Sequence, residues 1–254
     1  MLSVNAHTDM REPDGSAHAA LSFHSIDAAE FRDGELDSAL ELLDADERRR
    51  AERLRPALHR ARWVVAHAVQ RLQLATFLGR NPEAVRYERS PYGRPLLVAP
   101  ADSGHDVDFN ISHSGDVLLL GITTSGRIGV DVEAWVSDHS ADRSPLWETL
   151  SEREAEWVAS HTDAYAAFVR LWTRKEAVVK ALGTGLPDDL PALDVLLEAG
   201  STESMLRTPD GASLKVVDLP SPPGYHAAVA LTTPDVPVHV VANAPAASRF
   251  SLLP

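Results

Sequence analysis

One stretch does most to decide the fold of this chain: Leu171-Trp172-Thr173-Arg174-Lys175-Glu176-Ala177-Val178-Val179-Lys180. Trp172, Glu176 and Lys180 recur every four residues, so on a helix they share one face, with the acid between an aromatic ring and a cation. The apolar residues between them give the same helix a buried face. The pattern therefore predicts a long helix over residues 163–182, held in a core and presenting three functional side chains.

A second segment supplies two more carboxylates. Residues 127–133 alternate as a strand does, which puts Asp131 and Glu133 on the same face. Together with Glu176 they make three carboxylates, and a hard cation such as Mg²⁺, or Mn²⁺ in its place, prefers oxygen ligands of this kind. Lys180, one turn beyond Glu176, can then reach a phosphate that shares the metal. Each pattern alone is common on exposed strands and helices, so the inference depends on their combination.

Two turns add further polar groups. Ser112-His113-Ser114-Gly115 follows a short apolar strand and presents hydroxyls, backbone N–H groups and an imidazole, which together suit an anion. Gly93-Arg94-Pro95 places an arginine between a turn glycine and the start of the next strand. Taken singly, the first turn is better explained as a surface loop with an incidental histidine. The second has the alternative explanation of an ordinary hairpin turn with a surface arginine.

These four segments occur in a characteristic order. The chain resembles the large, Sfp-type 4'-phosphopantetheinyl transferases, whose motifs are G-[KR]-P, N-x-S-H-S, G-[IV]-D-[IV]-E and W-x-x-K-E-A-x-x-K. The resemblance covers roughly residues 45–185, and the W-KEA form is similar to the branch that serves polyketide and nonribosomal peptide assembly lines. The matching segments are Gly93 to Pro95, Asn110 to Ser114, Gly129 to Glu133, and Trp172 to Lys180.

The resemblance implies a Mg²⁺-dependent transfer of the 4'-phosphopantetheine arm of coenzyme A to a serine of an acyl or peptidyl carrier protein, with release of 3',5'-ADP. Carried over residue by residue, Asp131, Glu133 and Glu176 match the family's metal ligands. Lys180 matches the lysine that contacts the pyrophosphate of coenzyme A, and His113 matches the histidine that contacts a phosphate of the same molecule. With Asp131 and Glu176, Lys180 and His113 form the predicted catalytic group.

The predicted coenzyme A contacts also include several basic residues. Arg94 matches the basic residue of the nucleotide-contacting turn, and Arg50 and Arg62 are the nearest matches to residues that reach the 3'-phosphate. A solvated helix face, on which the arginines of residues 48–62 pair with acidic neighbours, is an equally good explanation of this basic run. The complete predicted set is Arg50, Arg62, Arg94, Ser112, His113 and Lys180.

The identity of the general base stays open at this point. A serine hydroxyl needs a proton acceptor within hydrogen-bond reach, and Glu176 is the candidate, directly or through a metal-bound water. A glutamate that ligates a cation has a lowered pKa and is a weak base. Two other functions also stay open: a non-catalytic carrier-protein or nucleotide-binding protein of the same fold, and a metal-dependent phosphohydrolase.

Composition narrows the class of protein. The 254 residues contain no cysteine, which excludes disulfides and thiolate metal sites, and carry a net charge of −13, which disfavours nucleic acid as a partner. No apolar run reaches membrane-spanning length, and the first twenty residues lack the hydrophobic stretch of a signal peptide. We therefore expect a cytoplasmic monomer with no membrane or nucleic-acid partner.

The segments predict an α+β fold of two pseudo-symmetric subdomains, each a small antiparallel sheet packed on a long helix, with the active site in the cleft between them. Capping-box patterns at Asp44 and Ser151 each precede a helix. We expect a disordered N-terminus over 1–18, an N-terminal subdomain over 19–125, a C-terminal subdomain over 126–242 and a loose tail over 243–254. The predicted long helices are 57–78 and 163–182, and the predicted strands are 19–26, 96–99, 107–111, 117–124, 128–133, 213–217, 226–231 and 236–241.

Overall fold

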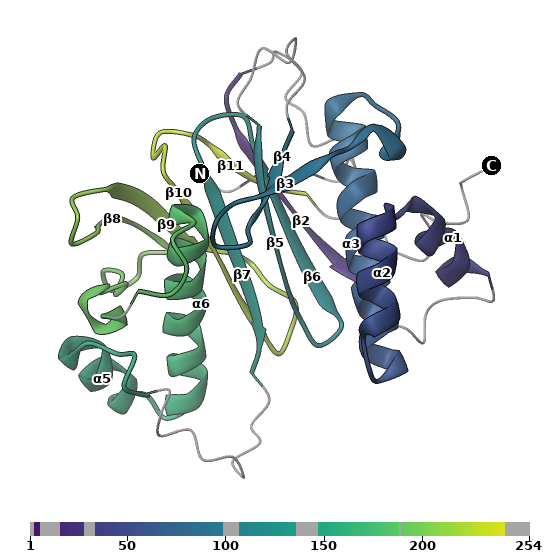
Figure 1. The fold of residues 1–254 in the computed structure, drawn as a ribbon. Coiled ribbons are helices and arrows are strands. Elements are labelled where there is room, and N and C mark those ends of the chain that lie inside the picture. The colour runs from purple at the N-terminus through teal and green to yellow at the C-terminus, as the bar shows by residue number, and fades with distance from the viewer. Residues whose placement is uncertain are drawn as a thin grey trace.

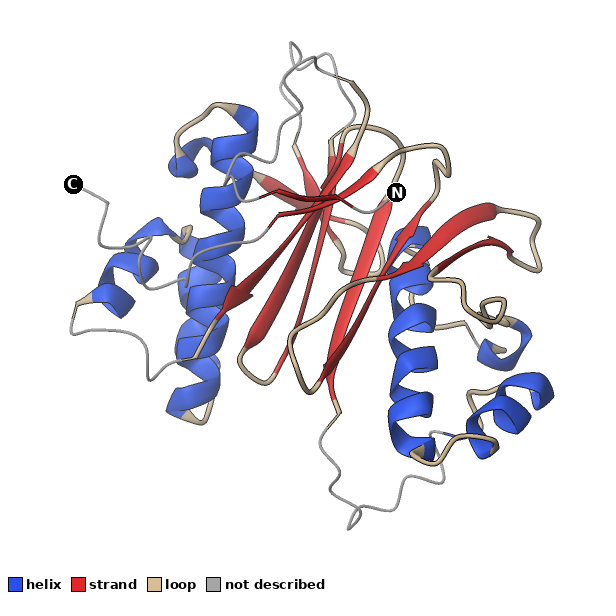
Figure 2. Cartoon of the chain, turned by 180° about the vertical axis from the view of Figure 1, so that it is seen from behind, coloured by secondary structure: helices blue, strands red, loops and turns tan. Residues whose placement is uncertain are grey.

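In this computed structural model, two β-sheets lie face to face between two long helices, giving four layers in the order helix, sheet, sheet, helix (Figure 1). Helix α3 (Ala57–Leu78) covers the outer face of one sheet, and α6 (Ala164–Leu182) covers the outer face of the other. The view from behind shows the same layering (Figure 2). The structure describes residues 3–5, 16–27, 34–98, 107–135, 147–187 and 189–241.

The first sheet has five strands in the order β1-β11-β2-β6-β5. In β6 (Val117–Thr123), Leu118 and Leu120 pack toward α3, while Leu119 between them packs against the second sheet, as the two-residue period of a strand requires. A separate hairpin follows α3 and consists of β3 (Tyr87–Arg89) and β4 (Pro95–Leu97). The other strands of the five-stranded sheet are β1 (Ser3–Asn5), β2 (Ala19–Ser25), β5 (Asp108–Ser114) and β11 (Val238–Val241).

The second sheet is antiparallel throughout, in the order β7-β10-β9-β8. Alternation in β7 (Ile128–Ala134) turns Val130 and Val132 into the core between the sheets. Asp131 and Glu133 therefore face the other way, toward α6. The remaining strands of this sheet are β8 (Glu203–Arg207), β9 (Ser213–Asp218) and β10 (Tyr225–Leu231).

Both predicted capping boxes are confirmed. Asp44 caps α2 (Ala45–Arg53) and Ser151 caps α5 (Glu152–Ala159), and in each case the glutamate three residues later bonds back to the cap. The predicted helix over 57–78 has the same bounds in the structure, and the catalytic-helix prediction over 163–182 differs only in that Asp163 is the N-cap. Within the described residues, the remaining helices are α1 (Glu35–Leu42) and the short 3₁₀ turns η2 (Pro82–Ala84) and η3 (Leu190–Ala192).

The α+β class with two sheets and long covering helices is confirmed, but three local expectations were wrong. The strand near 236–241, expected in the C-terminal half, is β11 and pairs in parallel with β2 of the first sheet. Within the N-terminus expected to be disordered, Ser3–Asn5 pairs with β11. No strand was predicted within residues 188–209, yet this segment contains β8 (Glu203–Arg207). The predicted tail over 243–254 lies outside the described residues.

Among the helices that the structure describes, none combines the length and the apolar character that a membrane crossing needs.

Candidate functional site

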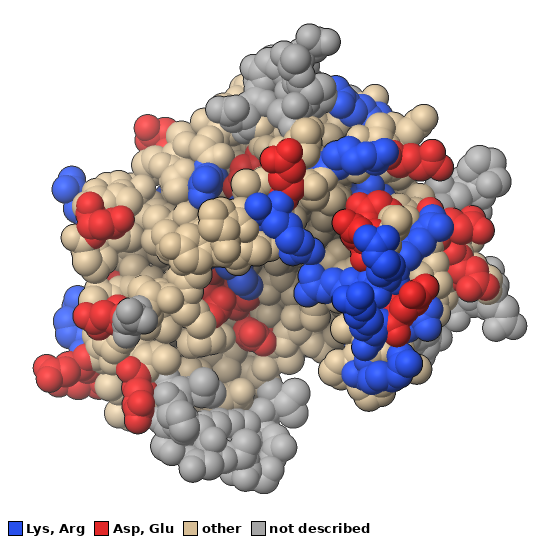
Figure 3. Space-filling view, in the orientation of Figure 1, with Lys and Arg blue, Asp and Glu red and all other residues tan. Residues whose placement is uncertain are grey.

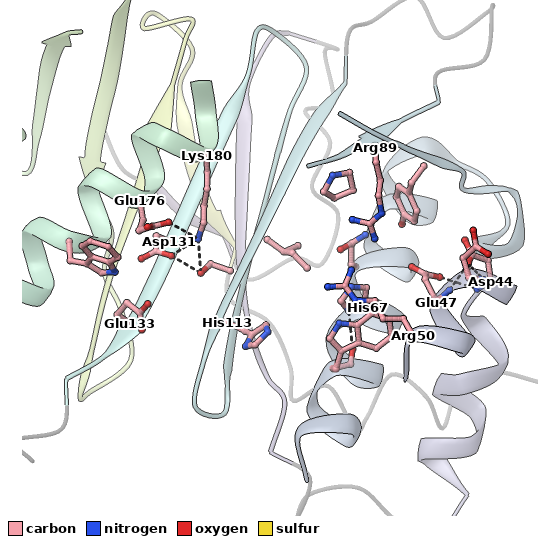
Figure 4. A pocket seen from close by; sticks show the side chains of 18 residues that line it. Asp44, Glu47, Arg50, His67, Arg89, His113, Asp131, Glu133, Glu176 and Lys180 are labelled. Carbon is pink, nitrogen blue, oxygen red and sulfur yellow. Dashed lines mark hydrogen bonds and ion pairs between the residues drawn. The ribbon is translucent and has the colours of Figure 1, made fainter. Parts of the chain in front are cut away.

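A cavity of about 760 Å³ lies where α6 and β7 face α2, α3 and β3 (Figure 4). Its walls contain most of the site residues predicted from the sequence and place them opposite each other across the space. Two predicted residues, Arg62 and Arg94, do not line it. The predicted residues that do line it are Arg50, Ser112, His113, Asp131, Glu133, Glu176 and Lys180.

The α6 wall depends on an unusually close approach between helix and strand. Trp172, Glu176 and Lys180 are the only positions between 171 and 180 that are not buried, so the predicted stripe faces the cavity. On the strand, Gly129 lies directly under the helix backbone: a Cβ atom added there would be 2.0 Å from the carbonyl oxygen of Ala177. The missing side chain lets β7 and α6 bring their carboxylates together.

Asp131 is the most buried carboxylate of the cavity, with 2% of its surface exposed. Its Oδ1 accepts hydrogen bonds from Lys180 Nζ at 2.6 Å and from the Ser112 hydroxyl at 2.7 Å. Its Oδ2 is buried and has no hydrogen-bond partner. Because a buried, unpartnered carboxylate oxygen is costly, this atom is suited to a ligand that supplies positive charge.

Glu133 and Glu176 complete the acidic group. Desolvation raises the pKa of Glu133, and the charge of Asp131 raises it further, while the Ser114 hydroxyl donates to its Oε2 at 2.8 Å. Desolvation likewise raises the pKa of Glu176, partly offset by Lys180, whose Nζ is 4.0 Å from Glu176 Oε2. Both carboxylates are therefore disfavoured as anions unless a cation comes close.

The three predicted metal ligands do not form a ready cluster. Within the part of the chain that the structure describes, no group of three or more acidic, histidine or cysteine side chains is arranged to hold a metal ion. The ammonium of Lys180 instead pairs with Asp131 and lies near Glu176. The donor set still fits a hard cation, since it consists of oxygens only, includes the orphaned Asp131 Oδ2 and contains two carboxylates with raised pKa values.

Strand β5 joins this wall to the rest of the molecule through its side chains. The backbone N–H groups of Ile128, Val130 and Ala134 donate to Asp108 Oδ2 at 2.9 Å, Asn110 Oδ1 at 2.9 Å and Ser114 Oγ at 3.1 Å. Each pair is 20 residues apart, so β5 and β7 run side by side in parallel, with side-chain oxygens in place of backbone acceptors. The predicted anion-binding motif is thus also the joint between the two sheets.

His113 is the exposed residue of that motif and lines the cavity. Desolvation within the cleft lowers its pKa below the ordinary 6.5, and the nearby cation Lys180 lowers it further. The imidazole is therefore neutral near pH 7, where it offers one N–H donor to a ligand rather than a full charge.

Besides the predicted Arg50, the opposite wall contains residues that the sequence analysis did not select. Arg50 lies over the ring of Trp63, 5.8 Å from its centroid. The His67 ring stacks on Trp63, with the two ring centroids 3.7 Å apart. Arg89 from the hairpin points into the same space (Figure 4). Spacing contained the signal: Trp63 and His67 are one turn apart on the predicted helix, and Gln70, which also lines the cavity, continues the same face.

His67 is uncharged in this wall. Burial lowers its pKa to about 3, which outweighs the hydrogen bond that its Nδ1 makes with the carbonyl of Trp63 at 3.0 Å. Because a carbonyl only accepts, Nδ1 carries the proton and Nε2 does not. The wall thus combines two arginines with a neutral, stacked pair of rings, which suits a flat base bearing phosphates.

The basic run near α2 divides between the two explanations given for it. Lys and Arg side chains gather over α2 on the face that contains the hollow (Figure 3). Arg48 donates to the carbonyls of Leu43 and Glu41, and Arg49 pairs with Asp46, so these arginines serve the helix itself. Arg50 alone among the arginines of residues 48–62 lines the cavity.

The two remaining predicted contacts are engaged elsewhere. Arg62 forms an ion pair with Asp116 in the turn between β5 and β6. The guanidinium of Arg94 is buried and pairs with Asp108 at 2.6 Å. Arg62 therefore lies away from the cavity, whereas Arg94 also lines a smaller cavity of about 360 Å³ that includes Glu176 and Lys180. The sequence reveals that a turn is basic but not where its side chain points.

Comparison with known proteins agrees with this geometry. Residues 127–230 match the family model of the 4'-phosphopantetheinyl transferase superfamily, and residues 31–125 match the model of the 4'-phosphopantetheinyl transferase N-terminal region. The two matches meet at Gly126 and together cover well over half of the chain. The first contains the acidic wall and the second contains the arginine and aromatic wall.

Individual relatives have the same family name. The chain is 29% identical over 188 residues to the 4'-phosphopantetheinyl transferase HetI of a Nostoc species, which covers 73% of this chain and 78% of HetI. It is 36% identical over 128 residues to the 4'-phosphopantetheinyl transferase AcpT of Salmonella typhi, covering 50% of this chain and 60% of AcpT. A 4'-phosphopantetheinyl transferase of Bacillus subtilis is 27% identical over 179 residues, covering 70% and 76% of the two chains. The chain therefore belongs to the 4'-phosphopantetheinyl transferase superfamily, a class of enzymes.

Proposed function

We propose that this protein transfers the 4'-phosphopantetheine moiety of coenzyme A to a serine hydroxyl of an apo acyl or peptidyl carrier protein. The serine oxygen forms a bond to the phosphorus that bears the pantetheine arm, the bond from that phosphorus to the bridging oxygen breaks, and 3',5'-ADP leaves with the electron pair. The serine proton passes to a base. The observation that carries this proposal is the two-walled cleft, in which a carboxylate and lysine group faces an arginine and aromatic wall.

The arginine and aromatic wall is suited to the 3',5'-ADP half of coenzyme A. Arg50 and Arg89 supply the positive charge that phosphates need in a chain whose net charge is −13. Trp63 and the neutral His67 offer flat surfaces to the adenine. His113, between the two walls, can donate its N–H to a phosphate oxygen.

Lys180 is the cation nearest the reacting group in this proposal. Displacement at phosphorus depends mainly on positioning and on neutralising charge that develops on the phosphoryl oxygens and the leaving group. Lys180 Nζ already lies among carboxylates, 2.6 Å from Asp131 Oδ1, and 27% of its side chain is exposed to the cavity. A bound pyrophosphate would offer it a further anionic partner besides Asp131 and Glu176.

Asp131, Glu133 and Glu176 would hold a Mg²⁺ ion, or Mn²⁺, at this wall. The fit rests on the unpartnered Oδ2 of Asp131 and on the raised pKa values of the two glutamates. When bound, such an ion would neutralise negative charge on the phosphoryl oxygens and the leaving group.

Glu176 is the proposed proton acceptor for the serine. Desolvation raises its pKa, which would partly offset the lowering that a bound cation causes, and a more basic carboxylate takes a proton from a hydroxyl more readily. Glu133 also has a raised pKa, but its Oε2 is already engaged by the Ser114 hydroxyl. Glu176 makes no hydrogen bond of that kind in the described residues, which leaves its oxygens available.

Incubation with coenzyme A, Mg²⁺ and an apo carrier protein tests the proposal, with the carrier weighed by mass spectrometry. A transferase adds the mass of phosphopantetheine and releases one 3',5'-ADP for each carrier labelled. A carrier whose acceptor serine is replaced by alanine is the matched control and should stay unlabelled. Consumption of coenzyme A without labelling would indicate a phosphohydrolase, and binding without either change would indicate a non-catalytic protein.

A further inference from the structure

Arg94 lies in the turn of the β3–β4 hairpin, yet its side chain is directed into the protein. The side chain is 7% exposed. One terminal nitrogen, Nη2, donates to Asp108 Oδ2 at 2.6 Å, to the Phe109 carbonyl at 3.0 Å and to the Ile128 carbonyl at 2.8 Å. The other, Nη1, donates to the carbonyl of Lys180. One guanidinium thus links the hairpin to β5, β7 and α6.

The contact between Arg94 and the carbonyl of Lys180 lies in the last turn of α6. The last four carbonyls of a helix lack the partners that continue the hydrogen-bond ladder, and they carry the negative end of the helix dipole. Helix α6 ends at Gly183, and the carbonyl of Lys180 belongs to its last turn. Arg127 donates to the carbonyl of Leu182 at 3.2 Å, so two arginines from outside the helix stabilise this turn.

Arg94 has little left to offer a substrate phosphate. Its charge is balanced by Asp108, both of its terminal nitrogens donate within the protein, and it does not line the 760 Å³ cavity. Arg89, in the same hairpin, is exposed and lines that cavity beside Arg50, although one of its terminal nitrogens donates to the Gly93 carbonyl at 2.9 Å. Arg94 instead lines a smaller cavity of about 360 Å³, which it shares with Glu176 and Lys180.

We propose that Arg94 is a positioning residue that fixes Lys180, by holding the last turn of α6 against β5 and β7, and that its guanidinium does not bind a substrate phosphate. Because the held carbonyl and the reactive ammonium belong to the same residue, loss of this contact displaces the ammonium relative to Asp131. The kinetic test of this inference rests on the proposed function of the cleft, because it needs turnover.

A kinetic comparison separates positioning from phosphate binding. Arg94→Met should lower kcat by roughly ten- to a hundredfold, because a displacement on the order of 1 Å has that effect on a positioned group, while the KM for coenzyme A stays within about threefold. Arg89→Met, the matched control from the same hairpin, should do the reverse. In the Lys180→Ala background, Arg94→Met should cause less than about a threefold further loss of kcat, because the two residues act as one unit. Additive losses, or a rise in KM that exceeds the fall in kcat, would overturn the proposal.

Hydrogen exchange tests the same point without turnover. In Arg94→Lys, a single ammonium cannot reach the carbonyls of Phe109, Ile128 and Lys180 together, so amide exchange over residues 180–185 should accelerate by about tenfold or more. Arg89→Met should leave exchange there unchanged. Unaltered exchange in Arg94→Lys would refute the positioning role of Arg94 even if the variant were less active. If the wild-type protein labelled no carrier, the proposed function would fail while the exchange result still decided the role of Arg94.

Discussion

Gly129→Ala places the smallest possible side chain at the closest contact between β7 and α6. The new Cβ atom would lie 2.0 Å from the Ala177 carbonyl oxygen and 2.3 Å from the Ala181 nitrogen, whereas ordinary contact begins at 3.4 Å. Both obstructing atoms belong to helix backbone and cannot rotate away, so helix and strand must separate by about 1.4 Å. If the separation acts along the Lys180–Asp131 pair, now 2.6 Å long, that pair opens to about 4 Å and its hydrogen bond is lost.

Two measurements follow from this displacement. Overpacking should lower the free energy of unfolding by about 1–3 kcal/mol, and misplacement of the catalytic side chains should lower kcat on the order of a hundredfold in the molecules that remain folded. Denaturant unfolding gives the first value, and carrier labelling at saturating coenzyme A gives the second. The expected order of effects is therefore a modest loss of stability with a large loss of rate.

Gly121→Ala is the matched control, also a glycine in a strand that packs between the two sheets. Its new Cβ atom would meet Val130 Cγ1 at 2.7 Å and Ile128 Cδ1 at 2.8 Å, which are ends of side chains between the two sheets. Gly121→Ala should likewise lower the free energy of unfolding by about 1–3 kcal/mol. It should spare kcat, because α6 keeps its place on β7. A Gly129→Ala enzyme with wild-type kcat, or a Gly121→Ala enzyme equally impaired in kcat, would refute the link between this close approach and catalysis.

Three further predictions use the same structure. EDTA should abolish carrier labelling, and Mg²⁺ or Mn²⁺ should restore it; full activity in chelated buffer would exclude the metal site. If Glu176 is the base, Glu176→Gln should keep a depressed kcat even at saturating Mg²⁺. Because the pKa of His113 lies below 6.5, its ring gains a proton only as pH falls. The affinity for coenzyme A, measured by calorimetry in metal-free buffer, should therefore rise below about pH 6.5 in the wild type and less so in His113→Gln; equal pH profiles would argue against a phosphate contact. Lys175 and Glu154 are paired at 2.8 Å, and both side chains are 0% exposed. Lys175→Met should therefore lower the free energy of unfolding by about 3–5 kcal/mol, because it leaves a buried carboxylate without its partner. A loss below about 1 kcal/mol in chemical denaturation would contradict this expectation.

Features set by short-range chemistry were predictable from the sequence. The capping box of Asp44 and Glu47 requires only residues three apart, and Gly183, with a φ of 70°, ends α6 where a left-handed residue is needed. The stripe of Trp172, Glu176 and Lys180 follows from helical period alone, and it lines the cavity as expected. Local rules thus located the acidic wall before its partners in space were known.

Features set by distant partners were not predictable in the same way. Alternation in Val238–Val241 determines which faces are apolar, but the strand's partner, β2, is more than two hundred residues away, and a period of two does not select it. The edge strand Glu203–Arg207 has exposed alternate positions and few apolar residues, so its pattern is weak. Arg94 shows the same limit for a side chain, since its acceptors come from β5, β7 and α6.

The side-chain joint between β5 and β7 has a consequence for dividing the molecule. Both are terminal strands of their sheets, and side chains of β5 accept hydrogen bonds from the backbone N–H groups along the edge of β7. Cleavage of the chain at Gly126 would expose β5 and β7 as free sheet edges that can pair with other chains. It would also leave β2 without its partner β11, which comes from the far end of the sequence. We therefore expect fragments 1–126 and 127–254 to aggregate when each is produced alone and to reconstitute activity only when produced together, as in a split-protein reporter.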